Sequence, residues 1–182
     1  MALTTGSGDL KTRAPDFTLP GVDGRDWSLA EVAGKNGTVV AFICNHCPYV
    51  VAVIDRIVAD AATLAAEGIG FVAISANDPV AYPQDSFPRM KDFASRHGFG
   101  FPYLFDGSQE IARAYDAACT PDIYGLSAEG MILYRGRLDE GRMQPPPPGA
   151  KRELVEAMRL IAETGQGPYV QHPSMGCSIK WR

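Results

Sequence analysis

Two apolar runs separated by one helical segment limit the folds open to this chain. Residues 38–43 (TVVAFI) and 69–75 (IGFVAIS) are continuous apolar stretches, typical of strands buried on both faces of a sheet. Between them, apolar side chains recur with helical spacing after Pro48, and Gly68 ends that pattern. The segment therefore predicts a strand–helix–strand unit with parallel strands and a right-handed crossover.

The rest of the chain adds further strands and helices to this unit. We expect, in chain order, a helix over 87–97, a short strand over 101–105, a helix over 108–118, antiparallel strands over 122–126 and 131–137, and a helix over 151–164. This order is typical of the α/β class, with a central mixed β-sheet and helices on both faces.

The length of the chain fits one domain of ordinary size. With 182 residues, we expect a single domain over 1–182, with its core at about 13–164. Residues before this core form an N-terminal extension, and residues 165–182 form a C-terminal tail.

Charge and hydropathy argue against several classes of partner. A formal net charge of −4 argues against nucleic acid and gives no attraction to an anionic membrane surface. The longest apolar runs, 39–44 and 49–54, fall far short of the ~20 residues that span a bilayer. The first residues do not resemble a secretory signal, so we expect a cytoplasmic protein, and we expect no cofactor. Asp139-Glu140, among several arginines, predicts a solvated charged turn.

Cys44 and Cys47 form a C-x-x-C motif at the predicted junction between the first buried strand and the helix. Proline is favoured at the first helical position, so Pro48 makes Cys47 the expected N-cap. Free backbone N–H groups at a helix start stabilise a thiolate and lower its pKa. A second thiol three residues away can close a disulfide, as reversible two-electron exchange requires. The motif therefore predicts redox chemistry, with Cys47 the more acidic thiol.

Three alternatives to redox chemistry stay open for these thiols. Cysteine is a common core residue, so the pair could be structural. A structural zinc ion would need four ligands, and Cys119, Cys177 or His172 could join the motif only through folding. A soft cation such as Cu(I) could be held by the two motif cysteines together with His46.

Several further segments accompany the motif in a fixed order. They are APDFTL at 14–19, Asp23-Gly24, VVAF at 39–42 and TPD at 120–122. Together with the motif they resemble the thioredoxin-like redoxins, which include thioredoxins and peroxiredoxins, over about residues 13–137. The ending PSMGCSIKWR at 173–182 resembles the tail of bacterial thioredoxin family proteins with CNHC centres. The resemblance implies a cis-proline beside the active thiols, at the Thr120-Pro121 bond.

The motif departs from both branches of that superfamily. Asn45-His46 stands where thioredoxins carry Gly-Pro, and a short preceding segment places Cys47 at the thioredoxin nucleophile position. Cys47 followed by proline fits the end of the peroxiredoxin motif, whereas Val40 and Cys44 replace its proline and threonine. The arginine that peroxiredoxins carry near the strand after Tyr115 is also missing, because Cys119 and Thr120 occupy that stretch. The resemblance therefore implies disulfide exchange ahead of peroxidase activity.

Other side chains near these segments each have two interpretations. His46 as a cation would stabilise a neighbouring thiolate, whereas a solvated imidazole would have no role. Cys119 is either a small core residue or a third thiol near Pro121. Cys177 is either a packed residue or part of a tail that folds over the site, and Tyr49 either packs or lines a substrate groove.

These observations predict a thiol-disulfide oxidoreductase. The expected catalytic residues are Cys44, Cys47, His46, Thr120 and Pro121, with no metal. The expected partners are a protein or small-molecule disulfide substrate and a thiol reductant, and the oligomeric state is left open. Alternatives are a peroxiredoxin-like thiol peroxidase, with Cys47 peroxidatic and Cys44 resolving, and a non-catalytic soft-metal-binding module.

Overall fold

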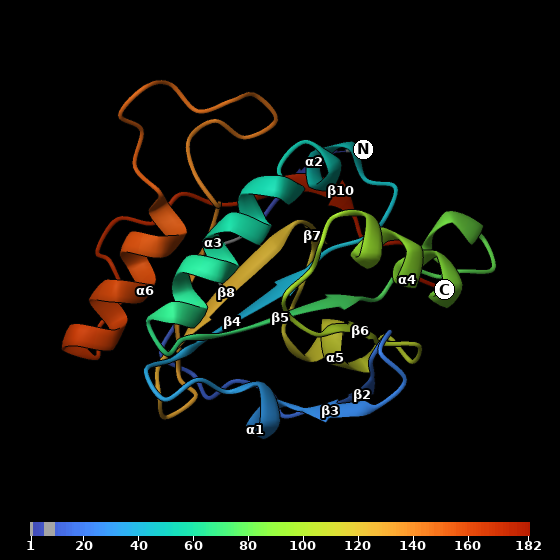
Figure 1. The fold of residues 1–182 in the computed structure, drawn as a ribbon, viewed down its shortest axis with the longest axis horizontal. Coiled ribbons are helices and arrows are strands. Elements are labelled where there is room, and N and C mark those ends of the chain that lie inside the picture. The colour runs from blue at the N-terminus through green and yellow to red at the C-terminus, as the bar shows by residue number, and fades with distance from the viewer. Residues whose placement is uncertain (1, 6–9) are drawn as a thin grey trace.

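A five-stranded sheet forms the centre of the computed structural model, which describes residues 2–5 and 10–182 (Figure 1). Its strand order is β6-β5-β4-β8-β9. The parallel strands are β4 (Thr38–Phe42), β5 (Gly70–Ser75) and β6 (Tyr103–Phe105), and the antiparallel ones are β8 (Asp122–Leu126) and β9 (Ile132–Gly136). The central mixed sheet and the α/β class are therefore confirmed.

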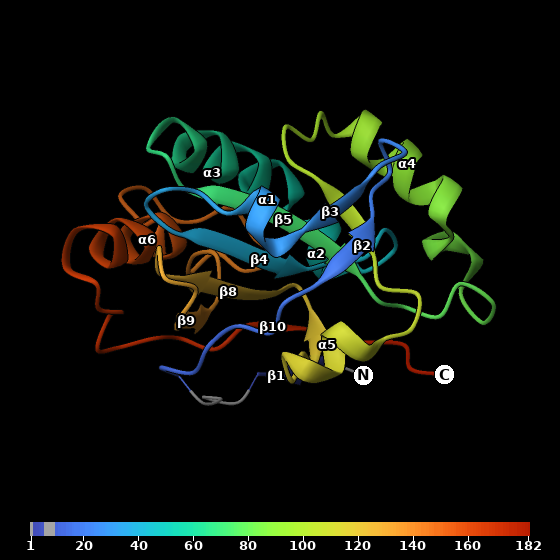
Figure 2. The same cartoon turned by 90° about the horizontal axis from the view of Figure 1, so that it is seen from below.

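Helices cover both faces of this sheet (Figure 2). The first face carries α3 (Ile54–Ala66), α4 (Phe87–Arg96) and α6 (Glu153–Thr164), which pack over Val39 and Ala41 of β4. The second face carries α1 (Leu29–Val32), α5 (Glu110–Ala114) and the hairpin of β2 (Thr18–Pro20) and β3 (Asp26–Ser28). They cover Val40 and Phe42, so β4 is buried on both faces as its apolar run predicts. No helix among residues 2–5 and 10–182 is long and apolar enough to cross a membrane.

The helix predicted after Pro48 is interrupted. The structure has a helix of four residues, α2 (Pro48–Val51), and a new helix that begins at Ile54. Val53 lies between them with φ −117°, and its N–H bonds to the Val50 carbonyl, three residues back rather than four. The prediction of one continuous helix is therefore wrong, and the C-x-x-C motif precedes only a short one.

The helix predicted over 108–118 is also too long. It is confined to Glu110–Ala114, because Asp116 adopts a left-handed conformation with φ 54°. This turn leads the chain into a two-residue strand, β7 (Cys119–Thr120).

A second, three-stranded sheet has the order β1-β10-β7. It joins β1 (Ala2–Thr4) and β10 (Met175–Ser178), which lie at opposite ends of the chain, to β7. All pairings are antiparallel, and Cys177 lies opposite Thr120. The C-terminal tail therefore returns to the neighbourhood of the cysteine motif (Figure 1).

The charged segment after β8 is not solvated as predicted. The Arg135 side chain is buried, and its Nη2 lies 3.0 Å from Oδ2 of the fully buried Asp122. Asp139 is also buried, with its carboxylate 3.3 Å from Nε of Arg56. The prediction of a solvated turn is wrong at these residues because each charge has a partner: Arg135 pairs with Asp122 on the adjacent strand, and Asp139 pairs with Arg56 of α3. Glu140 is exposed, as predicted.

Candidate active site

The two cysteines of the motif follow β4 at its carboxyl end and are both buried. Cys44 is 1% exposed and Cys47 is 0% exposed. Cys47 is the N-cap of α2, in an extended conformation, with Pro48 at the first helical position. The expected N-cap position is therefore confirmed, although the Cys47 side chain makes no capping hydrogen bond.

Thr120 contacts both thiols. Its hydroxyl lies 3.4 Å from Cys44 Sγ, and its carbonyl oxygen accepts a hydrogen bond of 3.1 Å from Cys47 Sγ. The Thr120-Pro121 peptide bond is cis, which confirms the prediction made from the resemblance. The structure thus brings Cys44, Cys47, Thr120 and Pro121 together from two segments more than seventy residues apart.

The two thiols differ sharply in acidity. Hydrogen bonding from the Cys44 thiol is the largest cause that lowers the pKa of Cys47, to about 4, and the Thr120 and Cys177 side chains act in the same direction. The same bond, together with burial and the charge of Asp85, raises the pKa of Cys44 well above its usual value. The Thr120 carbonyl accepts only from the thiol form of Cys47 and so opposes its ionisation. The prediction that Cys47 is the more acidic thiol agrees with these directions. Its main cause is a neighbouring thiol rather than the helix start.

His46 is held in place by a buried carboxylate. Its Nδ1 lies 2.6 Å from Oδ2 of Asp85, a side chain that is 0% exposed at the end of the 3₁₀ turn η1 (Pro83–Asp85). The His46 ring also stacks on Tyr82, with centroids 5.6 Å apart and an interplanar angle of 7°. His46 is therefore not a freely solvated imidazole, because two neighbouring groups fix its ring.

Asp85 is a site residue that the sequence reasoning missed. Its carboxylate also accepts hydrogen bonds from the Asn45 backbone N–H at 2.8 Å and from Asn77 Nδ2 at 2.7 Å. The sequence pointed only to one of its partners: Asn77 closely follows β5, and the carboxyl ends of neighbouring parallel strands meet at one edge of a sheet. Asp85 thus joins the loop after β5 to the dipeptide between the two cysteines.

The side chains of Cys44, His46 and Asp85 are also the one group of three that could hold a metal ion among the described residues. Their donor atoms all lie within 4.8 Å of one another. They offer sulfur, nitrogen and oxygen, a set that suits zinc, but a closed structural zinc site has four protein ligands.

The two remaining cysteines have different surroundings. Cys119 is fully buried, its Sγ lies 3.6 Å from the Pro121 carbonyl oxygen, and burial raises its pKa far above the usual value. It is therefore a small core residue. Cys177 is only partly buried, and its side chain and backbone lower the pKa of Cys47. The tail thus folds over the site.

Tyr49 lies beside the site but borders little free space. With Pro121 and Met175 it helps line a cavity of about 30 Å³, which has room for about one water molecule. Among the described residues, the cavity that Tyr49 lines is therefore too small for a disulfide-bearing substrate.

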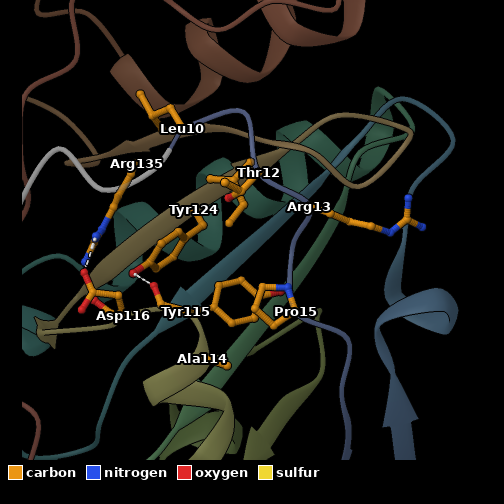
Figure 3. A pocket seen from close by; sticks show the side chains of 10 residues that line it. Leu10, Thr12, Arg13, Pro15, Ala114, Tyr115, Asp116, Tyr124 and Arg135 are labelled. Atoms are coloured by element: carbon orange, nitrogen blue, oxygen red, sulfur yellow. Dashed lines mark hydrogen bonds and ion pairs between the residues drawn. The ribbon is translucent and has the colours of Figure 1, made fainter.

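A larger pocket of about 630 Å³ lies away from the thiols (Figure 3). Its lining contains no cysteine, and two of its charged residues, Arg135 and Asp116, already have partners. Arg135 bonds to Asp116, and the Tyr124 hydroxyl donates to the Tyr115 carbonyl at 2.9 Å. This pocket therefore has no evident part in thiol chemistry.

Comparison with known proteins places this geometry in a family. The profile described as the AhpC/TSA family matches residues 10–135. The chain belongs to the AhpC/TSA family. Its resemblance to the thioredoxin-like redoxins is therefore confirmed. A Mycobacterium tuberculosis relative, named "Putative peroxiredoxin", is 27% identical over 128 residues, which cover 70% of this chain and 76% of that protein.

Solved structures resemble this member of the AhpC/TSA family over nearly its whole length. An uncharacterized conserved protein from Geobacillus kaustophilus is 42% identical with a TM-score of 0.94, and covers 100% of this chain and 97% of its own. A hypothetical protein from Sinorhizobium meliloti is 37% identical with a TM-score of 0.89, over 98% of both chains. A thioredoxin family thiol:disulfide interchange protein from Chlorobium tepidum, 22% identical over 86% of this chain and 99% of its own, shares the fold with a TM-score of 0.64.

Proposed function

We propose that this protein is a thiol-disulfide oxidoreductase in which Cys47 attacks first and Cys44 is its partner. The observation that supports this most strongly is that two thiols, both in contact with Thr120, have pKa values shifted in opposite directions. The pKa of Cys47 is lowered to about 4, while that of Cys44 is raised. Exchange needs one thiolate that attacks and one thiol that stays protonated until its turn.

The oxidation of the pair in the proposed cycle uses only the two thiols and the substrate. The Cys47 thiolate attacks one sulfur of a substrate disulfide, forms a mixed disulfide and releases the other sulfur as a thiolate. Cys47 then no longer carries a charge, so the largest cause that raises the pKa of Cys44 disappears. Cys44 loses its proton and attacks Cys47 Sγ, which releases the second substrate thiol and leaves a Cys44–Cys47 disulfide. An external thiol reductant restores the pair.

His46, Thr120 and Pro121 serve this cycle as positioning residues in our proposal. Thr120 touches both sulfurs, and Pro121 fixes the backbone that carries it. His46 shares the Asp85 carboxylate with the Asn45 N–H, so it helps fix the turn between the two cysteines. A protein or small-molecule disulfide is the proposed substrate.

Insulin reduction driven by dithiothreitol tests the proposal. We expect the wild type to shorten the lag before turbidity, and a Cys44→Ser/Cys47→Ser variant to lose this effect. Cys119→Ala is the matched control, because it removes a buried thiol outside the pair. If the double variant and the wild type shorten the lag equally, the proposal is abandoned.

A thiol peroxidase is the second candidate, favoured by family membership and by an acidic Cys47 followed by Pro48. Against it, Cys44 replaces the threonine of that motif. Arg135, the buried arginine of β9, bonds to Asp116 and Asp122 rather than to Cys47. Hydrogen peroxide consumption coupled to dithiothreitol, measured on the same preparation, would favour this reading if it exceeded insulin reduction. Stoichiometric zinc or copper lost on His46→Ala would instead favour the metal-binding module.

A further inference from the structure

We infer that Cys177 is a third redox thiol of this site, which forms a disulfide with Cys47 and exchanges with external thiols and disulfides on behalf of the buried pair. The inference rests on the proposed function, because it assumes that Cys47 takes part in exchange. It adds a residue from the far end of the chain and a route by which electrons reach the site.

Cys177 is placed by strand pairing rather than by chance proximity. It lies in β10, opposite Thr120 of β7, and the Thr120 carbonyl is the group that accepts a hydrogen bond from Cys47. Both the side chain and the backbone of Cys177 also lower the pKa of Cys47. The strand that carries Cys177 therefore occupies the edge of the site where an extended substrate could pair with Thr120.

The tail is fastened on both sides of Cys177. Before it, the Ser174 hydroxyl donates to the Gly136 carbonyl at 2.7 Å, and its N–H donates to the Thr5 hydroxyl at 3.0 Å. After it, Ile179 is buried, and the Lys180 N–H donates to Asn77 Oδ1 at 2.9 Å. Asn77 in turn donates to Asp85, so the network around His46 also holds the tail.

The surroundings of Gly176 show how closely the C-terminal tail approaches Thr120 of β7. A Cβ atom at this position would lie 2.0 Å from the Thr120 carbonyl oxygen and 2.5 Å from its carbonyl carbon. Only glycine allows the tail to lie this close to β7, and this approach sets the position of the next residue, Cys177.

The three thiols differ in their exposure to solvent. Cys44 and Cys47 are 1% and 0% exposed, whereas Cys177 is only partly buried. The cavity beside Pro121 has a volume of about 30 Å³, too small for a disulfide-bearing substrate. In this arrangement an external reagent meets Cys177 before it meets either member of the pair.

The chemistry of thiol-disulfide exchange also indicates that Cys177, rather than Cys47, is the sulfur that external thiols attack. In a Cys47–Cys177 disulfide, an external thiolate attacks Cys177 Sγ, forms a mixed disulfide there and expels Cys47 as a thiolate. Cys47 is the better leaving group, because its pKa is about 4 while that of Cys177 is raised to about 11. A second external thiolate then attacks the external sulfur of this mixed disulfide and releases Cys177 as a thiolate. The two external thiols leave as a disulfide, and the protein has gained two electrons.

Mapping of disulfides in a Cys44→Ser variant tests the inference. Incubation with glutathione disulfide should give an intramolecular Cys47–Cys177 disulfide and two molecules of glutathione, identified by mass spectrometry of non-reduced peptides. A Cys44→Ser/Cys177→Ser variant should stop at a mixed disulfide with glutathione. With ~0.1 mM free glutathione, loss of the mixed disulfide should be about tenfold or more faster when Cys177 is present, because an intramolecular thiol acts at millimolar effective concentration or above.

Two further variants keep the test decisive. Gly176→Val in the Cys44→Ser background retains all the thiols but moves β10 away from Thr120, so the Cys47–Cys177 disulfide should form much more slowly. Cys177→Ser alone keeps the C-x-x-C pair. Its Cys44–Cys47 disulfide should form on the order of tenfold more slowly with glutathione disulfide, since the reagent must wait for the tail to open.

The outcomes distinguish this inference from the proposed function. If Cys44→Ser accumulates the glutathione mixed disulfide as Cys44→Ser/Cys177→Ser does, and Cys177→Ser matches the wild type in rate, the role of Cys177 is overturned. The proposed function then still stands, provided the wild type forms a Cys44–Cys47 disulfide. If neither disulfide forms in the wild type, both fail.

Discussion

His46 Nδ1 lies 2.6 Å from Asp85 Oδ2, and this carboxylate is completely shielded from solvent. Asp85 thereby gathers three partners: the imidazole between the two cysteines, the Asn45 N–H and the Asn77 amide. The arrangement makes one carboxylate responsible both for the shape of the motif and for the electrostatics of Cys44, whose pKa it raises. Its removal should therefore affect stability and thiol chemistry together.

We expect Asp85→Asn to lower the free energy of unfolding by about 1–3 kcal/mol, because the amide has one acceptor oxygen where three partners converge. The pKa of Cys44 should fall, since the Asp85 charge raises it. Urea unfolding and thiolate titration measure the two effects. Asp55→Asn is the control: its carboxylate also contacts a histidine, at 3.3 Å from His97, but its side chain is 91% exposed. Equal losses for both variants would contradict the assigned role.

The acidity of Cys47 predicts how its ionisation depends on pH. Because its pKa is lowered to about 4, the thiolate should persist as pH falls from 8 to about 6 and be half lost near pH 4. Ultraviolet thiolate absorbance measures this without need for a reagent to enter the site. In Cys44→Ala the largest stabilising hydrogen bond is gone, so the midpoint should move up toward the ordinary value of about 8.5. Identical midpoints in the two proteins would show that Cys44 is not the cause.

The buried ion pair of Arg135 and Asp122 predicts that removal of Arg135 lowers the free energy of unfolding by an amount that depends on pH. Arg135→Leu should lower the free energy of unfolding by about 3–5 kcal/mol, because it leaves Asp122 buried without its charge partner. Burial already raises the pKa of Asp122, and loss of Arg135 raises it further. The folded variant then keeps a proton that the wild type releases at its own, less strongly raised pKa. The loss of unfolding free energy relative to the wild type should therefore grow as pH rises above the wild-type pKa of Asp122.

Denaturant unfolding at several pH values measures this trend. Arg159→Leu is the control for loss of an arginine, since its pair with Glu67 is largely exposed and should contribute only about 0–1 kcal/mol. If the loss of unfolding free energy in Arg135→Leu becomes smaller as pH rises, Asp122 does not have the raised pKa that this prediction assumes.

Gly70 offers a test of how the sheet is packed at the start of β5. A Cβ there would lie 2.0 Å from the Val32 carbonyl oxygen, so Gly70→Ala should destabilise the fold by about 1–3 kcal/mol. Gly100→Ala is the matched control, because nothing lies within 4 Å of its Cβ position. Thermal unfolding of the two variants compares them, and a similar melting temperature for both would show that the segment around Val32 yields easily.

The parts of the fold that local pattern controls could be predicted from the sequence. The buried strands β4 and β5 and the hairpin β8-β9 begin and end within about one residue of their expected limits, because their side-chain pattern reports burial directly. Helix α6 ends at Gly165, which takes the left-handed conformation that glycine favours at this position. The cysteine motif and Thr120-Pro121 were recognisable as short segments.

Features that depend on distant contacts could not be predicted in the same way. The Val53 break and the early end of α5 arise from backbone turns that apolar spacing does not encode. Asp85 becomes part of the site only through Asn45 and Asn77, and the acidity of Cys47 depends on which thiol lies nearest after folding. The pairing of β10 with β7 joins segments more than fifty residues apart, and no local signal specifies its register.

The sheet that unites both ends of the chain has a practical consequence for anyone who expresses this protein. Ala2 lies opposite Cys177 on one side of β10, and Thr120 lies opposite it on the other. An affinity tag fused at either end is therefore attached a few residues from the thiols rather than at a remote surface. Tagged and tag-free preparations should be treated as different reagents, and rates should be compared only after the tag has been cleaved.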